Sequence, residues 1–176
     1  IALLSPAYII IPILIKSGSK RKVIFKQKRI GLHGNEFEIL KFRTMKENSE
    51  KNGPQLSSEN DKRITKVGKF LRKTRLDEIP QFFNVLKKEM SIVGPRPERQ
   101  YFIDKIVQEA PHFKHIHKVV PGITSWGQVK YGYAENVEEM VQRLKYDILY
   151  IKNQSLALDL KILLYTVIIV LQRKGK

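Results

Sequence analysis

The chain has 176 residues, enough for about one domain, and 42% of them are hydrophobic, which excludes an intrinsically disordered or low-complexity protein. It contains no cysteine, so a disulfide-stabilised scaffold and a thiolate zinc or redox site are also excluded. The 33 Lys and Arg residues outnumber the 17 Asp and Glu residues and give a formal net charge of +16. Such an excess predicts an anionic partner: a nucleic acid, an acidic lipid or a phosphorylated small molecule.

The first predicted element is the segment at residues 1–15, which is apolar apart from Ser5. As a helix it would be about 22 Å long. That is shorter than the hydrocarbon core of about 30 Å. Pro6 and Pro12 would kink or break such a helix. No basic region or cleavage site precedes it, so we expect the chain to begin inside a longer hydrophobic segment rather than at a secretory signal.

Seven basic residues, from Lys16 to Arg29 and with no acidic residue among them, follow this segment. Cations beside a proline-interrupted apolar run favour an anionic membrane surface. The positive-inside rule places them on the cytoplasmic side. A buried core helix followed by a solvated linker is the alternative.

Residues 23–42 are predicted to form a β-hairpin, because two strand-like segments flank a glycine-rich turn at 31–35. Residues 47–61 are mostly polar and predict an exposed loop. A helix is then expected from Ile64, with Phe70 and Leu71 on its apolar face.

A second helix is predicted to begin at the adjacent acids Asp77 and Glu78, because apolar residues recur after them at helical spacing. Its expected apolar face consists of Ile79, Phe82, Phe83 and Leu86. Residues 94–97 form a proline-stiffened loop, and a helix is expected over 98–109.

Two further helices are predicted near the end of the chain, with Asn136 and Ser155 as their N-caps. The last of them carries no charge over residues 162–171, which suits a helix that lies in a membrane surface or deep in a core. The predicted fold is therefore α+β and mostly helical, with a small β-hairpin and amphipathic helices.

Asp77 and Glu78 are the strongest candidates for chemistry. Six cations lie between positions 63 and 75, directly upstream of them. An ionised carboxylate among cations can attack phosphorus, because the cations offset its repulsion from phosphate oxygens. A neighbouring carboxylate could hold Mg²⁺ on the same phosphates. Ordinary acidic capping of a helix is the alternative.

Arg96 is the second candidate, because the flanking prolines pre-set its backbone for gripping a phosphate; a plain surface turn is the alternative. His112, His115 and His117 match no familiar metal motif, and a polar surface turn is the simpler interpretation. Trp126 could stack a base, anchor an interface or pack in the core.

Several segments together resemble one family. They are KQKRIGLHGNEFEILKFRTM, GKFLRKTRLDEIPQFFNVLKKEMSIVGPRPE, PGITSWGQV and LDLKILL. In this order they are similar to the bacterial sugar transferases, the monotopic polyprenyl-phosphate phosphoglycosyl transferases. The resemblance covers nearly the whole chain. It departs from the family pattern at Arg75, Phe83, Ser125 and Gly127, which bears on sugar preference.

The resemblance implies a two-step transfer. Asp77 would attack the β-phosphate of a UDP-sugar, UMP would leave, and polyprenyl (undecaprenyl) phosphate would then take the sugar phosphate from the enzyme. Glu78, with Asp77, would hold Mg²⁺. The phosphate-binding residues would be Arg96, Arg72 and Lys41. The stretch GYAENVEEM resembles the long, exopolysaccharide-assembling type of the family.

The resemblance also implies a location on the cytoplasmic face of the bacterial inner membrane. Residues 1–15 would be the C-terminal part of a re-entrant membrane helix broken at Ser5 and Pro6, and residues 16–176 would be the catalytic domain. Expected partners are a UDP-sugar, polyprenyl phosphate and anionic lipids but no nucleic acid, and a homodimer is compatible with the chain. The alternative is a basic peripheral membrane or nucleic-acid-binding protein without catalysis.

Overall fold

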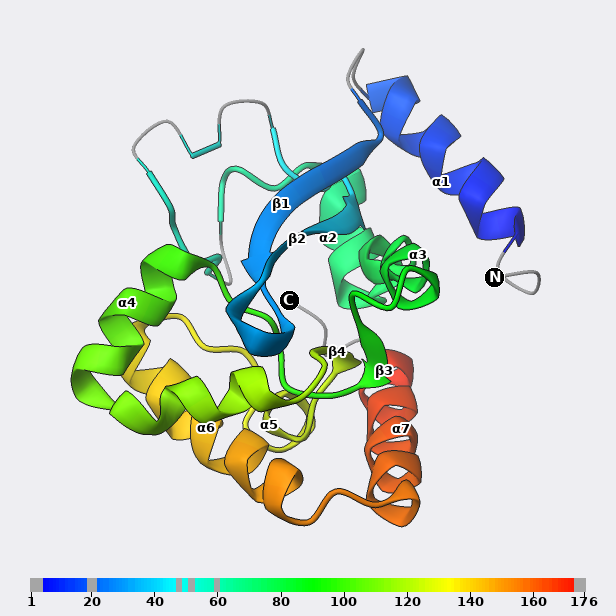
Figure 1. The fold of residues 1–176 in the computed structure, drawn as a ribbon. Coiled ribbons are helices and arrows are strands. Elements are labelled where there is room, and N and C mark those ends of the chain that lie inside the picture. Colours follow the sequence, from blue (N-terminus) through cyan, green and yellow to red (C-terminus); the bar gives the residue numbers. More distant parts are fainter. Residues whose placement is uncertain (1–4, 19–21, 47–48, 51–52, 59–60, 173–176) are drawn as a thin grey trace.

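The computed structural model describes residues 5–18, 22–46, 49–50, 53–58 and 61–172. The fold is α+β and mostly helical, as the sequence predicted (Figure 1). Its elements in chain order are α1 (Ser5–Gly18), β1 (Ile24–Ile30), the 3-10 turn η2 (Leu32–Gly34), β2 (Glu36–Phe42), α2 (Lys66–Lys73), the 3-10 turn η3 (Leu76–Glu78), α3 (Gln81–Leu86), β3 (Ser91–Val93), α4 (Gln100–Glu109), the 3-10 segment η4 (Pro111–Lys118), β4 (Gly122–Thr124), α5 (Trp126–Lys130), α6 (Val137–Lys152) and α7 (Leu156–Leu171).

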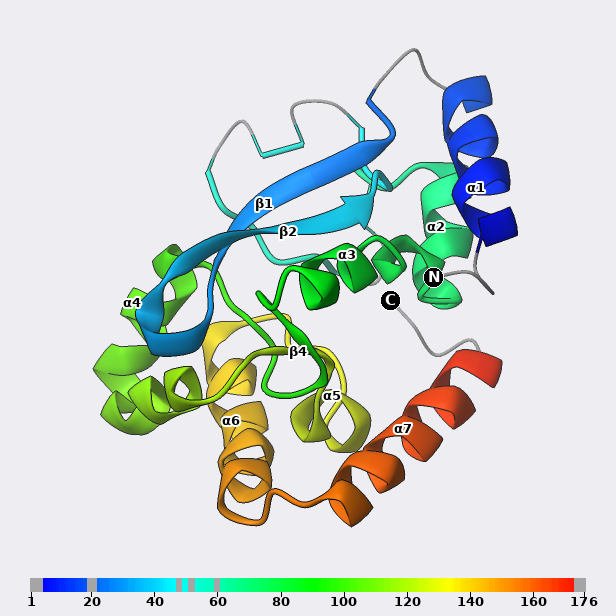
Figure 2. The same ribbon diagram turned by 45° about the vertical axis from the view of Figure 1, so that its right-hand side comes forward.

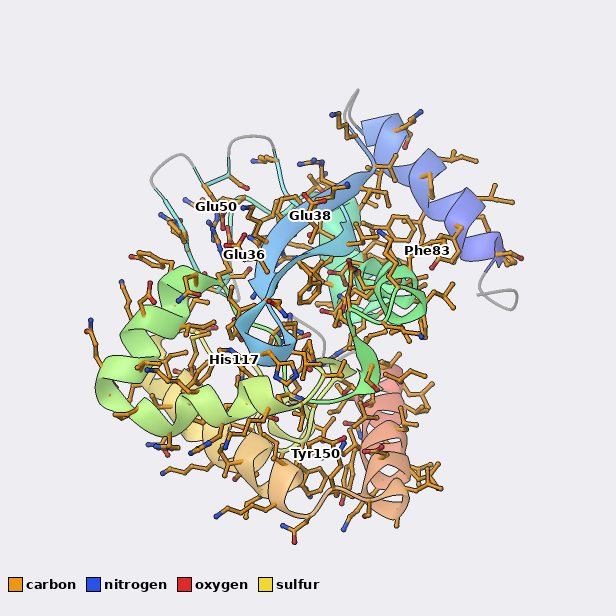
Figure 3. All side chains as sticks on the ribbon, in the orientation of Figure 1. Glu36, Glu38, Glu50, Phe83, His117 and Tyr150 are labelled. Carbon is orange, nitrogen blue, oxygen red and sulfur yellow. The ribbon has the colours of Figure 1, made fainter. Side chains whose placement is uncertain are left out.

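The predicted hairpin is confirmed. Strands β1 and β2 pair antiparallel from Ile24 opposite Phe42 to Ile30 opposite Glu36. Successive side chains of a strand point to opposite faces. On one face Lys26 and Lys28 form exposed ion pairs with Glu38 and Glu36, while the other face of β1 carries Phe25, Gln27 and Arg29. The two glutamates are labelled on the hairpin in Figure 3.

Helix α2 lies tightly against the chain that follows β2. Thr65 is its N-cap, and the Thr65 hydroxyl accepts a hydrogen bond from the Gly68 amide at 2.9 Å. A side chain at position 68 would collide with the backbone of Thr44, so glycine is required for this close approach. The helix is thereby held with its inner face against the hairpin.

The turn that carries Asp77 and Glu78 differs from the prediction. Both acids lie in the 3-10 turn η3, and the α-helix begins only at Gln81. Arg75, immediately before the turn, has left-handed backbone angles (φ 55°, ψ 16°). For a residue other than glycine this costs about 1–2 kcal/mol. The chain therefore turns sharply here instead of continuing a regular helix.

The predicted apolar face of α3 is also corrected. Asn84 is fully buried, and its amide bonds the backbone of β2: the Leu40 N–H donates to Asn84 Oδ1 at 3.0 Å and Asn84 Nδ2 donates to the Glu38 carbonyl at 2.8 Å. Helix α3 therefore covers the free edge of the hairpin, and Asn84 supplies the hydrogen bonds to it. Phe83 and Leu86, expected in the core, are 41% and 68% exposed.

The main hydrophobic core lies between α4, η4, α6 and the end of β1. Phe102, Ile106, Phe113 and Leu144 are each at most 5% exposed there. Asn136 caps α6 as predicted and accepts a hydrogen bond from the Glu139 amide. A short parallel pair, β3 with β4, was not predicted and joins this half of the molecule to α7.

Helices α1 and α7 lie along one side of the molecule, away from α4, in both views (Figures 1 and 2). Helix α1 is continuous from Ser5 through Pro12, so the expected interruption at Pro12 is wrong. Ser5 and Pro6 form its first turn; the chain before them lies outside the described residues, and the re-entrant helix stays a prediction. Among the described residues, none of the helices is long and apolar enough to cross a membrane.

Candidate active site

A cavity of about 450 Å³ lies between the hairpin, the segment that follows β2, and the start of α4. Eight cationic and four acidic side chains line it, so its walls carry an excess of positive charge. The predicted residues Lys41, Arg72, Asp77, Glu78 and Arg96 all line this one cavity, although they come from four separate segments of the chain. Such a lining suits an anionic ligand with several charges.

Asp77 lies at the cavity wall with a free carboxylate. The residue is 6% exposed, and within the described part of the chain its side chain makes no hydrogen bond or ion pair. Burial raises the pKa of Asp77 to about 6, against the opposing charge of Lys41. The carboxylate is therefore ionised near neutral pH and has its lone pairs available.

Glu78, the adjacent acid, is held by three cations. Lys41 Nζ lies 2.7 Å and Arg96 Nη2 lies 3.3 Å from Glu78 Oε1, and Arg75 Nη1 lies 3.9 Å from Oε2. Burial by itself would raise the pKa of Glu78, but the charges of Lys41, Arg96 and Arg75 outweigh it and lower that pKa well below its usual value. The environment therefore separates the pKa values of two neighbouring carboxyl groups, which is the pattern expected when they have different roles.

Arg72 lies half-buried beside this pair and forms no ion pair with a carboxylate among the described residues. Its Nε donates to the Thr44 hydroxyl at 2.9 Å and its Nη1 donates to the Ser57 hydroxyl at 2.6 Å. Both partners are neutral, so the guanidinium keeps its full charge for a ligand. The tight contact of α2 with Thr44 is what aims Arg72 into the cavity.

A buried charge network supports the loop that carries Arg96. Arg29 donates to the Pro97 carbonyl at 3.1 Å and to Glu98 at 3.0 Å, and Arg143 donates to Glu98 at 2.6 Å. These contacts tie β1, the proline loop and α6 together. The sequence analysis missed this network, because residues 29, 98 and 143 are far apart in the chain and follow no motif.

The polar loop over residues 47–61 was expected to be exposed, and among its described residues this holds for Gln55 and Ser58, whereas Ser49, Glu50, Leu56 and Ser57 are half-buried where they line the cavity. Arg63 holds the loop, because its guanidinium bonds Asp61, the Gln55 side chain and the Ser49 and Leu56 carbonyls. Glu50, labelled in Figure 3, forms an ion pair with Arg99 of 2.7 Å at the start of α4. The loop is therefore a wall of the cavity.

The cations upstream of Asp77 separate into two groups. Arg72 and Arg75 lie beside the two acids, whereas Lys66, Lys69 and Lys73 are exposed on α2 and Arg63 pairs with Asp61. The histidines lie apart from the cavity: His112 and His115 are exposed on η4, whereas His117, labelled in Figure 3, is half-buried. Trp126 packs edge-on against Tyr165 of α7, which favours the packing interpretation.

No cluster of three or more His, Cys, Asp or Glu side chains is placed to hold a metal ion, as far as the described residues extend. Asp77 and Glu78 offer two adjacent carboxylates. Protein-bound Mg²⁺ is commonly held by one or two carboxylates together with substrate phosphates and water. The donor set therefore fits Mg²⁺ only when a phosphorylated ligand supplies the remaining oxygens.

Comparison with known proteins gives a consistent result. The family model described as bacterial sugar transferase matches residues 1–173. The chain is 46% identical, over 95% of its length, to a UDP-N-acetylgalactosamine-undecaprenyl-phosphate N-acetylgalactosaminephosphotransferase of Aeromonas hydrophila, of which it spans 40%. It is 43% identical, over 94% of its length, to a UDP-glucose:undecaprenyl-phosphate glucose-1-phosphate transferase of Klebsiella pneumoniae, of which it spans 36%.

A shorter relative is matched over most of its length. The chain is 40% identical to the sugar transferase EpsL of Bacillus subtilis, over 92% of this chain and 75% of that protein. With the Aeromonas and Klebsiella proteins, by contrast, it shares less than half of their length. The family model and these relatives agree with the site geometry: the chain belongs to the bacterial sugar transferase family.

Proposed function

We propose that the chain transfers a sugar 1-phosphate from a UDP-sugar to polyprenyl phosphate through a covalent intermediate on Asp77. In the first step an Asp77 carboxylate oxygen bonds to the β-phosphorus, and the bond from that phosphorus to the oxygen bridging to the α-phosphate breaks, so that UMP leaves. In the second step an oxygen of polyprenyl phosphate attacks the same phosphorus. The bond to Asp77 breaks, and polyprenyl-diphosphate-sugar leaves with the carboxylate regenerated.

One observation carries this proposal: of the two adjacent acids, Asp77 alone is unpaired within the described part of the chain, at the wall of a cationic cavity. A nucleophile needs a free lone pair, and Glu78 already uses Oε1 for Lys41 and Arg96. With a pKa of about 6, Asp77 is mostly ionised at neutral pH. Its lowered solvation favours attack over hydrogen bonding to water.

The cations of the cavity supply the charge that a diphosphate needs. The hydrogen-bond partners of Arg72 within the described residues are both neutral, so it can bind a phosphate oxygen directly. Arg96 and Lys41 both contact Glu78, so they lie beside the nucleophile and can stabilise charge that moves from the β-phosphate to UMP. Proline on both sides of Arg96 keeps this side chain in place as the first product leaves.

Mg²⁺ would be held by Asp77 and by the Glu78 oxygen Oε2, which faces Arg75 at 3.9 Å and is the less occupied of the two. When bound, the ion would neutralise charge on the diphosphate. Glu78 would then have two tasks, since it also keeps Lys41 and Arg96 aligned. A single carboxylate would thus couple the metal to the phosphate-binding side chains.

We further propose that the side formed by α1, α3 and α7 lies on the cytoplasmic face of the membrane, against anionic lipids. Its exposed apolar residues include Ile9, Ile13, Phe83, Leu86, Leu160, Leu164 and Leu171. Apolar area of this kind is rarely left to water. The basic stretch after α1 would meet the lipid phosphates, and residues 1–15 would complete a re-entrant helix. The acceptor lipid would then reach the cavity from its own membrane, at the start of exopolysaccharide assembly.

The first experiment measures UMP release from UDP-glucose and from UDP-N-acetylgalactosamine by the protein in membranes without any acceptor lipid. A burst of UMP and a phosphosugar bound to protein are expected for the wild type, and neither for Asp77→Asn. Asp104→Asn, an exposed change on α4, is the matched control and should behave as wild type. UMP release that requires polyprenyl phosphate, or turnover by Asp77→Asn, would instead support direct attack by the lipid.

A further inference from the structure

Tyr133 lies in the segment between α5 and α6 and lines the cavity beside the two acids. The Tyr133 side chain is half-buried, and its hydroxyl makes no hydrogen bond to another described residue. The hydroxyl is close enough to Asp77, Glu78, Arg75 and Arg96 for all four charges to act on it. A hydroxyl at the wall of a cationic cavity that has no hydrogen-bond partner among the described residues is available to donate to a ligand oxygen.

Burial raises the pKa of Tyr133, although the charges of Arg75 and Arg96 act in the opposite direction. The phenol therefore stays protonated and can donate a hydrogen bond at neutral pH. Among cations that already attract an anion, a neutral donor adds a directional contact without adding charge. Phosphate oxygens are acceptors with several lone pairs and fit such a donor.

Arg75 contacts the aromatic ring of Tyr133 and lies outside the cavity lining. The guanidinium carbon lies 5.3 Å from the centre of the Tyr133 ring, and Nη1 lies 3.9 Å from Glu78 Oε2. Arg75 itself is not part of the cavity lining, and its buried Nε has no partner among the described residues. One buried cation thus touches both the aromatic ring and the carboxylate.

The backbone of Arg75 is strained, since its φ is 55°. A left-handed residue with a long side chain persists only when the surroundings over-determine it. Here the left-handed turn is what directs the guanidinium inward, toward Tyr133 and Glu78. The strained backbone of Arg75 therefore belongs to a residue that contacts the candidate active site, and not to a residue of a surface loop.

We propose that Tyr133 is a substrate-contacting residue whose hydroxyl donates a hydrogen bond to the phosphate that is transferred, and that Arg75 is the positioning residue for it. The inference rests on the proposed function for its substrate, a nucleoside diphosphate-sugar. The transferred phosphate is the β-phosphate of the donor, which is also present in UDP but absent from UMP. Binding of UDP and of UMP therefore tests the contact separately from the reaction.

The first test compares UDP and UMP binding to the wild type and to Tyr133→Phe by titration calorimetry of the protein in detergent micelles. Loss of one hydrogen bond to a charged group should weaken UDP binding about 10- to 100-fold. UMP binding should stay unchanged. Tyr131→Phe is the matched control, because Tyr131 lies in the same segment but pairs with Tyr146 and is not in the cavity lining.

Equal weakening of UDP and UMP binding by Tyr133→Phe, or no weakening of either, would overturn the proposal. If Tyr133→Phe weakens UDP binding but not UMP binding, while the wild type releases no UMP from any UDP-sugar, then the proposed reaction fails and the binding role of Tyr133 stands. The two failures are thus distinguishable in one preparation.

The second test concerns Arg75. Arg75→Gly removes a backbone strain of about 1–2 kcal/mol, which offsets the loss of the long Glu78 contact and of the ring contact, so its thermal midpoint should change little. UDP binding should nevertheless fall by about 10-fold, and Arg75→Lys should retain more affinity because it keeps the cation over the ring. In a double-mutant cycle Arg75→Gly and Tyr133→Phe should be clearly non-additive, whereas Arg75→Gly and Tyr131→Phe should add.

A merely structural role for Arg75 predicts a different result. The affinity loss would then follow a lowered thermal midpoint, and UDP and UMP binding would fall together. Additive losses in the cycle with Tyr133→Phe would likewise overturn the positioning role.

Discussion

The cavity and the side formed by α1, α3 and α7 reverse the usual distribution of side chains. In the cavity Asp77, Glu78 and Glu98 are 4–6% exposed, although charged residues are rarely buried. On the helical side Leu164 and Leu171 are 66% and 76% exposed, although leucine is among the residues most often buried. The comparison teaches that the two regions suit different surroundings: the cavity suits an anion, and the helical side suits an apolar surface.

The two regions meet at the turn that carries the acids. The Tyr8 hydroxyl of α1 donates to the Ile79 carbonyl at 2.9 Å, directly after Glu78. Ile11 and Ile15 of α1 pack with Phe42, Leu71 and Ile79 in one small core. A helix with an exposed apolar side is therefore attached to the backbone of the candidate active site, and the proposed membrane contact would thereby be linked to the position of Asp77.

The largest effect on the free energy of unfolding is expected when the carboxylate that neutralises the buried cations of the cavity is removed. Glu78→Gln keeps the shape but leaves Lys41, Arg96 and Arg75 without their carboxylate, and breaking a buried ion pair costs about 3–5 kcal/mol. Urea denaturation should show this loss. Glu36→Gln breaks an exposed pair with Lys28 and should cost less than about 1 kcal/mol. Equal costs for the two variants would mean that the buried cluster is not held by Glu78.

Substitutions of Arg96 test whether the positive charge of the cavity contributes to the reaction rate rather than to the stability of the fold. Arg96→Ala should lower the rate of UMP release about 10²- to 10³-fold, as is typical for one preorganised charge stabiliser. Arg96→Lys keeps the charge but not the planar geometry, and should recover part of the rate. A rate for Arg96→Ala within a few-fold of wild type would remove this residue from phosphate binding.

The exposed leucines test the other region. Leu164→Gln should weaken binding to anionic phospholipid vesicles by about tenfold, because burial of one leucine side chain contributes at least about 1.5 kcal/mol. UDP binding should be unchanged, since position 164 is not part of the cavity lining. Tyr101→Gln, an exposed aromatic change on α4, is the control and should not alter vesicle binding. Equal effects of both changes would contradict the assignment of the membrane side.

Between pH 6 and pH 5 the reaction rate and the free energy of unfolding are expected to change in opposite directions. Because the pKa of Asp77 is about 6, the rate should fall about fivefold between pH 6 and pH 5 as the nucleophile is protonated. Stability should move the other way: the folded pKa lies above the usual 3.8, so the folded protein binds more protons in this range and the Asp77 contribution to unfolding free energy rises as pH falls.

The matched variant for this comparison is Asp77→Asn, which should lose the stability gain between pH 6 and pH 5. At lower pH the opposite behaviour is expected, because the lowered pKa values of Glu78 and Glu98 make protonation unfavourable in the folded protein. A rate that stays constant down to pH 5 would contradict an ionised Asp77 as the nucleophile.

Local sequence patterns correctly predicted those helices and strands whose first and last residues are set by nearby turn glycines or cap side chains. The hairpin at 24–42 and the caps Asn136 and Ser155 were found this way, because turn glycines and cap side chains act within a few residues. The face of α3 was wrong for a physical reason. Asn84 finds its partners on the backbone of β2, about forty residues away in sequence, and this turns Phe83 and Leu86 outward.

The sequence by itself determined the charge excess, the order of the elements and the family resemblance that drew attention to Asp77, Glu78 and Arg96, since composition and motifs are properties of the chain. The tertiary structure alone decided which cations surround Glu78, that Asp77 is left unpaired, and that Arg75 and Tyr133 join them. The physical reason is distance. A charge acts strongly only within a few ångströms, and packing of the hairpin, the proline loop and η3 brings these separate segments that close.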